Sequence, residues 1–484
     1  MATKKSKSKR SHKAAAAGGA IASSVSAAKQ KSYRSGVVDH RLGAAALQEI
    51  AERVLKLSHA DETEVDISVV SDALTRFANN TIHQSVAEQL VQVSVRAVAD
   101  GRTARASTNK TDEASLRRVV QSALDLARCL PPNPGLLPML RKQKYAKVER
   151  FFEETAAATP ELRARAVARV CKFAAKQKQT AAGIFSSGMM ETALANSSGL
   201  FAHYQQTRSE FSVTFLESNS SGWAKSNSPR ISEIDPEALA ARAGQKSQAS
   251  RAPREVKPGH YTAILEPAAV LDLVGFLFYD FAGTAVADQR SCLTGRMGKK
   301  LFGDNISMWD DVTHPMQLGA PFDGEGLPRQ KVTLVESGVP RNLVYSRATA
   351  QKMKAKPTGH GFALPNEYGE APMNLVFAGG NSSVDDMVRS TERGILSTRV
   401  WYIREVDPYE KVLTGMTRDG TFLVEDGRIV GGIRNFRFNQ SIIEMLSKVE
   451  MLGPAVRVAG EESFEMVVPA MKVRDFHFSE VTKF

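Results

Sequence analysis

The stretch from Leu265 to Leu301 joins a long apolar run to a glycine-rich turn, and it constrains the fold more than any other part of the chain. Read with a helical period, its first half keeps only Asp272 and Asp280 as charges. Most of such a helix must be covered by other elements. A membrane span needs about 20 largely uncharged apolar residues, and the uncharged piece from 273 to 279 is far shorter. The sequence therefore predicts a buried core helix.

Length and charge divide the rest of the chain. Its 484 residues exceed the size at which one core keeps growing, so two or three domains are expected. The formal charge is +12, but residues 1–36 hold nine Lys and Arg and no acid, which leaves about +3 for the remainder. We interpret residues 1–36 as a disordered basic tail. A nuclear address or nucleic-acid patch in KKSKSKR is the alternative, although the near-neutral body does not favour nucleic acid as a partner.

Three cysteines, Cys129, Cys171 and Cys292, lie far apart in the sequence. This spacing fits neither a disulfide framework nor a metal-binding knuckle. The N-terminus lacks the apolar segment of about 7–15 residues that a secretory signal requires. We therefore expect a reduced, cytoplasmic protein that does not contact a membrane.

Residues 37–258 mix helical and strand patterns, which predicts an N-terminal α+β region with a mostly antiparallel sheet. A division into two subdomains near 136–158 stays open. Thr159 and Pro160 form a helix start, and Asp100-Gly101 a hairpin turn. The other expected helices cover 42–57, 112–130 and 236–250. The expected strands cover 64–70, 75–85, 90–99, 102–108, 181–187, 190–196, 200–209 and 210–217, and residues 218–232 are expected to form a loop.

Residues 259–484 differ in character, with many short β-rich runs separated by glycine turns. Glu425 to Arg428 is a clear hairpin signal. The sequence predicts a β-rich, barrel-like C-terminal domain that carries the one buried helix. The fold class is therefore α+β.

Few residues carry recognisable chemistry. No two of the nine histidines lie within six residues of each other, so there is no HExxH or HExxxH zinc motif. Phosphate-binding loops and the GxSxG nucleophile turn are also missing. The acids Asp310, Asp311, Asp323 and Glu325 are an acid/base or cation-site candidate, against the alternative that they shape tight turns. His360, between two glycines, is a candidate on similar grounds, against a plain loop histidine.

Four runs in the second half together resemble the TldD and TldE (PmbA) family of peptidases. They are GTAVADQRSCLTGRMGKKL (283–301), APFDGEGLPRQKVTLVESGV (320–339), SRATAQKM (346–353), and TGMTRDGTFLVEDGRIV (414–430) with NFRFNQS (435–441). The resemblance covers nearly all of residues 37–484. It implies a role in peptide processing, including leader removal from modified peptides and degradation of unfolded segments.

Active TldD-like members of this family carry HExxxH on the helix equivalent to residues 267–282, and a cysteine near the C-terminus completes the zinc site. This chain has no histidine between His260 and His314 and no cysteine after Cys292. The resemblance therefore implies a TldE-like chain without catalytic or metal-binding residues, and zinc in a TldD-like partner. The degenerate metal-helix positions are Asp272, Val274, Gly275, Phe276, Tyr279 and Asp280.

Three functional hypotheses follow. The leading one is a non-catalytic subunit that pairs with a zinc-bearing TldD-like paralogue, or with a second copy of itself, to enclose peptide substrates. The second is a self-sufficient hydrolase that uses a carboxylate site, and the third is a peptide- or nucleic-acid-binding protein without proteolysis. The residues proposed to face the chamber or the peptide are Asp323, Glu325, His360, Arg418 and Asp419.

Overall fold

The structure, a computed structural model, describes residues 41–482, so the predicted basic tail lies outside the described residues. A six-stranded sheet in the order β3-β2-β1-β4-β5-β6 forms the N-terminal half, and every neighbouring pair in it is antiparallel. Its strands are β1 (Glu62–Ala78), β2 (Thr81–Ala99), β3 (Arg102–Thr108), β4 (Thr180–Asn196), β5 (Phe201–Leu216) and β6 (Ser221–Ser228).

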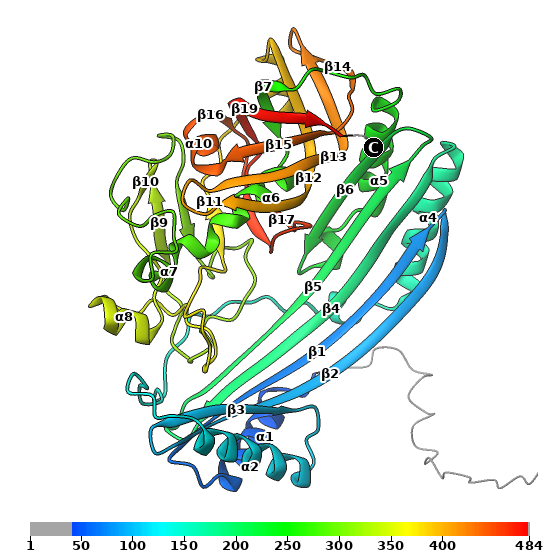
Figure 1. Ribbon diagram of the computed structural model, residues 1–484. Coiled ribbons are helices and arrows are strands. Elements are labelled where there is room, and N and C mark those ends of the chain that lie inside the picture. The colour runs from blue at the N-terminus through cyan, green and yellow to red at the C-terminus, as the bar shows by residue number, and fades with distance from the viewer. Residues whose placement is uncertain (1–40, 483–484) are drawn as a thin grey trace, which may run out of the picture. The chain divides into compact units, whose positions relative to one another are not determined.

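Helices pack on this sheet in two groups (Figure 1). One apolar cluster lies under α1 and α2 at one end of the long strands, and another lies under α4 and α5 at the other end. Leu47 and Leu116 belong to the first cluster, and Val170 and Phe211 to the second. The helices are α1 (Ala44–Leu57), α2 (Glu113–Cys129), α3 (Glu153–Ala156), α4 (Pro160–Lys176) and α5 (Pro236–Ala249), with the 3-10 turn η2 (Ile231–Glu233) before α5.

Local signals in the sequence placed several ends correctly. Asp112 caps α2 by accepting a hydrogen bond from the Ser115 N–H, and Thr159 caps α4 ahead of Pro160. Asp100 and Gly101 form the predicted hairpin turn between β2 and β3, and both have positive φ. The predicted helices of this half and its antiparallel sheet are confirmed.

Most of the predicted strand lengths were wrong, although β3 has the predicted bounds 102–108. Eight short pieces were expected, but four of the observed strands are 16–19 residues long. Gly188 was interpreted as the gap between two strands, yet it lies inside β4. Glycine is needed there because β1 approaches closely: a Cβ at position 188 would lie 2.7 Å from the Ser71 carbonyl oxygen. The expected loop at 218–232 contains β6, in which Trp223 and Ala224 are buried.

The C-terminal half is a five-stranded barrel with a second sheet. Pairing runs β12-β7-β19-β15-β13, and β12 pairs with β13 to close the ring. The barrel strands are β7 (Gly259–Leu265), β12 (Arg393–Asp407), β13 (Val412–Glu425), β15 (Phe436–Ser441) and β19 (Met471–Val481). Strand β14 (Arg428–Gly432) continues from β13 and β16 (Val449–Leu452) pairs with β19. The predicted α+β class and barrel are confirmed.

The second sheet has the order β10-β9-β8-β11-β18-β17. Its strands are β8 (Met308–Asp310), β9 (Val332–Glu336), β10 (Val339–Pro340), β11 (Leu375–Phe377), β17 (Val456–Val458) and β18 (Met466–Val468). The remaining helices are α6 (Pro267–Val274), the 3-10 helix η3 (Gly275–Phe281), α7 (Gly283–Ala287), α8 (Arg347–Met353), α9 (Val384–Arg389) and α10 (Ile442–Ser447).

The helix that was predicted over 267–282 is buried but not continuous. It is an α-helix only as far as Val274, and from Gly275 onward the chain forms the 3-10 helix η3. Glycine is a poor helix former, and a Cβ at Gly275 would lie 2.0 Å from the Ser463 hydroxyl oxygen. A distant segment therefore presses on the helix where its geometry changes. No helix within residues 41–482 is long and apolar enough to cross a membrane.

The helix-free face of the N-terminal sheet carries polar side chains that contact the C-terminal half. The Arg105 Nε atom donates to the Leu364 carbonyl at 2.7 Å. The Lys225 Nζ atom of β6 donates to the Gly460 carbonyl at 3.1 Å. Both halves thus contribute to the spaces described below.

Candidate functional site

Asp272 lies in the middle of α6 and is fully buried. Its carboxylate accepts hydrogen bonds from the backbone N–H groups of Glu461, at 3.1 Å, and Glu462, at 3.0 Å. A Cβ on Gly460 would lie 2.2 Å from the Asp272 Oδ1 atom, so only glycine fits there. Burial raises the pKa of Asp272 to about 6, against the two backbone hydrogen bonds that lower it. Asp272 therefore anchors the segment 460–462 to the helix.

Asp280, in η3, is buried against a lysine. Its Oδ2 atom lies 2.5 Å from the Lys411 Nζ atom, which also lies 2.6 Å from a Glu405 oxygen. Its Oδ1 atom accepts from the Cys292 N–H at 2.8 Å. Burial raises the pKa of Asp280, and the Lys411 charge opposes that shift. Burial and the neighbouring Asp280 charge also raise the pKa of the Cys292 thiol, which excludes Cys292 as a thiolate nucleophile.

A space of about 570 Å³, here called the helix hollow, lies between η3 and two later segments. Four of the six degenerate metal-helix positions line it, whereas Asp272 and Val274 are buried in α6. Aromatic rings form part of the wall, including Phe278 and Phe464 in edge contact at 5.2 Å. The lining residues are Gly275, Phe276, Phe278, Tyr279, Asp280, Arg290, Glu405, Lys411, Glu461, Glu462, Ser463 and Phe464.

Asp323 and Glu325 come together around Gly361, but inside the fold. The Asp323 carboxylate accepts from the backbone N–H groups of Glu325, Leu327 and Gly361 at 2.8–3.0 Å. A Glu325 oxygen accepts from the Arg347 N–H at 3.2 Å. Burial raises the pKa of both acids, to about 7 for Glu325, with a further contribution from the Asp323 charge.

His360, predicted beside these acids, points its ring nitrogens elsewhere. Nε2 lies 2.9 Å from the Asp310 carboxylate, and Nδ1 lies 2.9 Å from the Thr358 hydroxyl. Asp311 pairs instead with Lys331 at 3.2 Å. The acids grouped in the sequence as one possible cation site are therefore separate, internally satisfied contacts.

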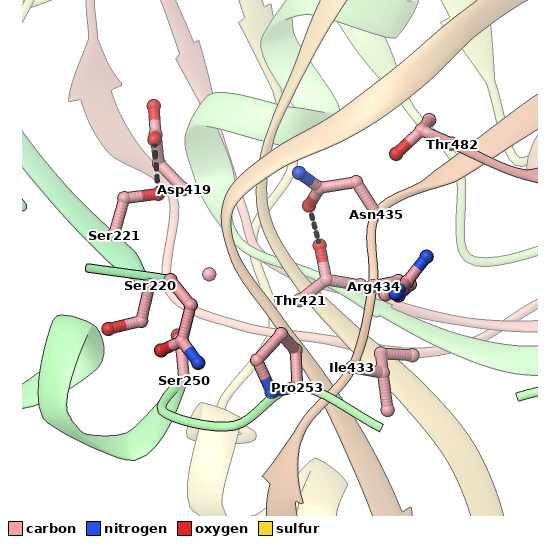
Figure 2. A pocket seen from close by; sticks show the side chains of 12 residues that line it. Ser220, Ser221, Ser250, Pro253, Asp419, Thr421, Ile433, Arg434, Asn435 and Thr482 are labelled. Carbon is pink, nitrogen blue, oxygen red and sulfur yellow. Dashed lines mark hydrogen bonds between the residues drawn. The ribbon is translucent and has the colours of Figure 1, made fainter. Parts of the chain in front are cut away.

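Arg418 and Asp419 belong to another cluster, where β13 meets β6. The Asp419 Oδ2 atom accepts from the Arg399 Nε atom at 3.0 Å, and Oδ1 accepts from the Ser221 hydroxyl at 2.7 Å. Arg418 lies 3.5 Å from the same carboxylate, and its guanidinium covers the Trp401 ring. Figure 2 shows Ser221 directed at Asp419 beside a small hollow of about 270 Å³. Arg399 holds the carboxylate from within the C-terminal half, and the hydrogen bond from Ser221 of β6 joins the two halves of the chain.

Three sequence models of domains from one family match this chain in order. The PmbA/TldA metallopeptidase domain 1 matches residues 63–127, the central domain matches residues 145–251, and the C-terminal domain matches residues 258–480. The chain belongs to the PmbA/TldD metallopeptidase family.

Individual relatives agree with this membership. The chain is 22% identical over 390 residues to Metalloprotease PmbA of Escherichia coli O157:H7, covering 77% of this chain and 83% of that protein. It is 29% identical over 173 residues to a Metalloprotease TldD homolog of Buchnera aphidicola, covering 35% of each chain. The chain spans 30–49% of the length of the first three curated relatives that it matches.

Solved structures share the fold of this PmbA/TldD family chain. TldE from Thermococcus kodakarensis superposes with a TM-score of 0.81 at 19% identity, covering 89% of this chain and 99% of that one. A putative modulator of a DNA gyrase from Thermotoga maritima gives a TM-score of 0.79 at 20% identity, with the same two coverages.

The helix hollow does not fit the zinc ion of an active PmbA/TldD member. Zinc takes imidazole, thiolate or carboxylate ligands, and the hollow is lined by neither histidine nor cysteine. Of its carboxylates, Asp280 is paired with Lys411, whose ammonium group would repel a metal cation. Within residues 41–482, no three His, Cys, Asp or Glu side chains are placed to hold a metal ion.

Lys411 and the segment 460–465 were not predicted as site residues, although Lys411 and residues 461–464 line the helix hollow. Lys411 follows a turn in the hairpin between β12 and β13 and has a positive φ of 49°. The run Gly460-Glu461-Glu462-Ser463 between β17 and β18 was the available clue, since a glycine beside two acids is unusual between apolar strands. Its partner Asp272 lies 189 positions earlier than Glu461, beyond any local pattern.

Proposed function

We propose that this chain is a non-catalytic subunit of a TldD/TldE-type zinc metalloprotease. It would pair with a TldD-like chain that holds the zinc ion, and the pair would process peptides or unfolded segments. The supporting observation is the PmbA/TldD fold with a metal helix whose positions along the helix hollow carry Gly275, Phe276 and Tyr279, and with Lys411 in the same wall. A second copy of this chain is the alternative partner.

The three cysteines agree with a reducing, cytoplasmic location for such a subunit. Cys129 is exposed, Cys171 and Cys292 are buried, and all three are free thiols. Disulfide-stabilised proteins belong to oxidising compartments. We therefore propose that the pair works on peptides inside the cell.

The structure gives less support to a carboxylate-based hydrolase or to a binding protein without proteolysis. Asp323, Glu325 and His360 are buried and bonded to neighbouring groups, so a hydrolase built on them would need a substrate to displace those bonds. The basic tail, which would serve nucleic acid, lies outside the described residues.

Co-expression tests the proposal. A tagged copy of this chain is produced alone and together with a paralogue that carries HExxxH, and each preparation is assayed for zinc by mass spectrometry and for cleavage of an unfolded protein. We expect zinc and chelator-sensitive cleavage only in the paired preparation. Both should vanish when the first motif histidine of the paralogue becomes alanine.

Two results would contradict the proposal. One is stoichiometric zinc with chelator-sensitive cleavage by this chain alone. The other is failure of the two chains to co-purify under conditions in which each is folded by circular dichroism.

A further inference from the structure

A second space, here called the strand hollow, lies where the two sheets approach each other. It has a volume of about 340 Å³ and is lined by β6, β17 and the helices α5 and α6. Strand β6 is the last strand of the N-terminal sheet and β17 the last strand of the second sheet, and the two lie close together (Figure 1). Among the described residues, neither strand has a partner strand on its outer side. Such edges leave backbone groups that an added chain can use.

Asn227 of β6 is the most informative group in the wall of the strand hollow. Its side chain is buried, with 7% of the residue exposed, and neither its amide nitrogen nor its amide oxygen has a hydrogen-bond partner in the described part of the chain. Buried polar groups are nearly always paired, so an orphaned amide indicates a missing partner. A carboxamide donates and accepts side by side, and a peptide group offers the complementary pair.

Arg457 of β17, the other strand, contributes a second buried polar atom without a hydrogen-bond partner. Its Nη1 atom donates a hydrogen bond to the Met316 carbonyl, and its Nη2 atom donates to the Glu465 carboxylate. Its Nε–H is buried and has no partner among residues 41–482. An N–H donor in this position suits a carbonyl oxygen. The strand hollow therefore presents unpaired polar atoms from both of its strands.

The charges around the strand hollow select against a charged ligand. Its three mostly buried cations each pair with a carboxylate: Lys225 with Glu461, Lys246 with Glu266, and Arg457 with Glu465. The exposed rim adds one cation, Arg242, and two acids, Glu233 and Asp235. No surplus of positive charge remains to hold a phosphate. Apolar atoms from Leu239, Pro267 and Val456 complete the wall, as is usual for a ligand pocket of this size.

We propose that the strand hollow binds the main chain of an extended, uncharged stretch of peptide. The Asn227 carboxamide pairs with one peptide group, donating to its carbonyl and accepting from its N–H, and the Arg457 Nε–H donates to another carbonyl. Recognition of main-chain groups accepts many sequences, which is what a protease subunit acting on unfolded segments requires. The inference rests on the proposed function for its substrate class, and it gives this chain a direct part in holding the substrate.

Fluorescence anisotropy with the full chain tests the proposal. The probe is a fluorescein-labelled peptide of alternating Ser and Val, and a second probe has the same sequence with every other amide N-methylated, so that half of its donors are missing. We expect Asn227→Leu to weaken binding of the first probe about tenfold, the equivalent of two lost hydrogen bonds. Asn109→Leu, at an exposed asparagine, should leave binding unchanged. The unmodified chain should bind the N-methylated probe about tenfold more weakly.

Thermal unfolding separates a binding role from a structural one. Leucine matches asparagine in size and removes the unpaired amide, so the ligand-free Asn227→Leu chain should melt at the same temperature as the unmodified chain or above it. Weaker binding in a chain of equal or greater stability supports the proposal. Equal affinity of the unmodified chain for the two probes, equal affinity of Asn227→Leu and the unmodified chain for the first probe, or no binding of the first probe would overturn it.

Assembly keeps this test distinct from that of the proposed function. Asn227→Leu should still co-purify with the HExxxH-bearing paralogue and its zinc. If the unmodified chain binds the probe through Asn227 but never assembles with that paralogue, the proposed function fails and the strand hollow remains a peptide site. If it assembles but binds peptide without Asn227, the inference fails and the proposed function stands.

Discussion

The strand hollow borders the start of α6 and the helix hollow borders η3, which follows α6, yet the two hollows differ in how their buried polar groups are satisfied. Beside the helix hollow, Asp272 accepts hydrogen bonds from two backbone N–H groups, and Asp280 forms an ion pair with Lys411. In the strand hollow, the Asn227 amide and the Arg457 Nε–H have no described partner. The buried acids beside the helix hollow are therefore paired within the chain, whereas the strand hollow has unpaired polar atoms. Substitutions in each space should therefore have opposite effects on stability.

The largest expected effect is at Lys411. Lys411→Met leaves the Asp280 carboxylate buried without its counter-charge, which should lower the free energy of unfolding by about 3–5 kcal/mol. Urea unfolding monitored by circular dichroism measures this. The double variant Asp280→Asn/Lys411→Met should recover most of the loss, and Lys300→Met, at an exposed pair with Asp304, should cost less than about 1 kcal/mol. A loss below about 1 kcal/mol for Lys411→Met would contradict the ion-pair role.

The next effect is a pH dependence that belongs to Asp272. Because its pKa rises from 3.8 when exposed to about 6 in the fold, the folded state holds its proton more tightly. The contribution of Asp272 to stability is therefore greatest below about pH 4 and falls as pH rises through 6. Between pH 4 and pH 7 the unmodified chain should lose about 2 kcal/mol relative to Asp272→Asn. Parallel urea titrations at pH 4 and pH 7 would show a constant difference if Asp272 did not titrate in this range.

A smaller effect is expected at Gly275. Gly275→Ala brings a methyl group against the Ser463 side chain, whose oxygen lies 2.0 Å from the new Cβ position, and should cost about 1–3 kcal/mol. Ser463→Gly should relieve part of that cost in a double-mutant cycle. Gly135→Ala is the control, because its Cβ would meet only the Asn133 side chain. Additive losses from Gly275→Ala and Ser463→Gly would show that these residues do not press on each other.

The smallest change should have the opposite sign. Asn227→Leu removes an unpaired buried amide from the strand hollow, so the free energy of unfolding should rise by about 1 kcal/mol. Asn196→Leu is the matched control, because Asn196 is also buried but its amide donates to the Leu140 carbonyl at 2.8 Å, so its loss should be destabilising. Urea unfolding of both variants compares an unpaired buried amide with a paired one. Destabilisation by Asn227→Leu would mean that the amide has a partner in solution.

Structural features that depend on neighbouring residues in the sequence could be predicted. The helix starts at Asp112 and Thr159, the Asp100-Gly101 turn and the antiparallel sheet follow from local chemistry. Most strand boundaries could not be predicted, because Gly188 and the polar residues of β6 are placed by a neighbouring strand rather than by their own propensities. The split at Gly275 depends on Ser463, a contact that no local pattern could reveal.

The site was predictable only in part, for the same reason. The absence of histidine between His260 and His314, and with it of HExxxH, can be read directly from the sequence. The acids Asp323 and Glu325 do meet, but His360 turns to Asp310, fifty positions away. Lys411 and Asn227 stand out only because they are buried, and the sequence does not show which lysines and asparagines are buried.

The long strands of the N-terminal sheet also determine how this half of the chain can come apart. Strands β1 and β2 fall within the first matched domain and β4 to β6 within the second, yet β1 pairs with β4 over its length. Each sequence domain thus holds half of a sheet that neither could complete, so the two should melt in one cooperative transition. Their pairing joins residues more than a hundred positions apart, such as Glu64 and Asn196, so it should form late in folding.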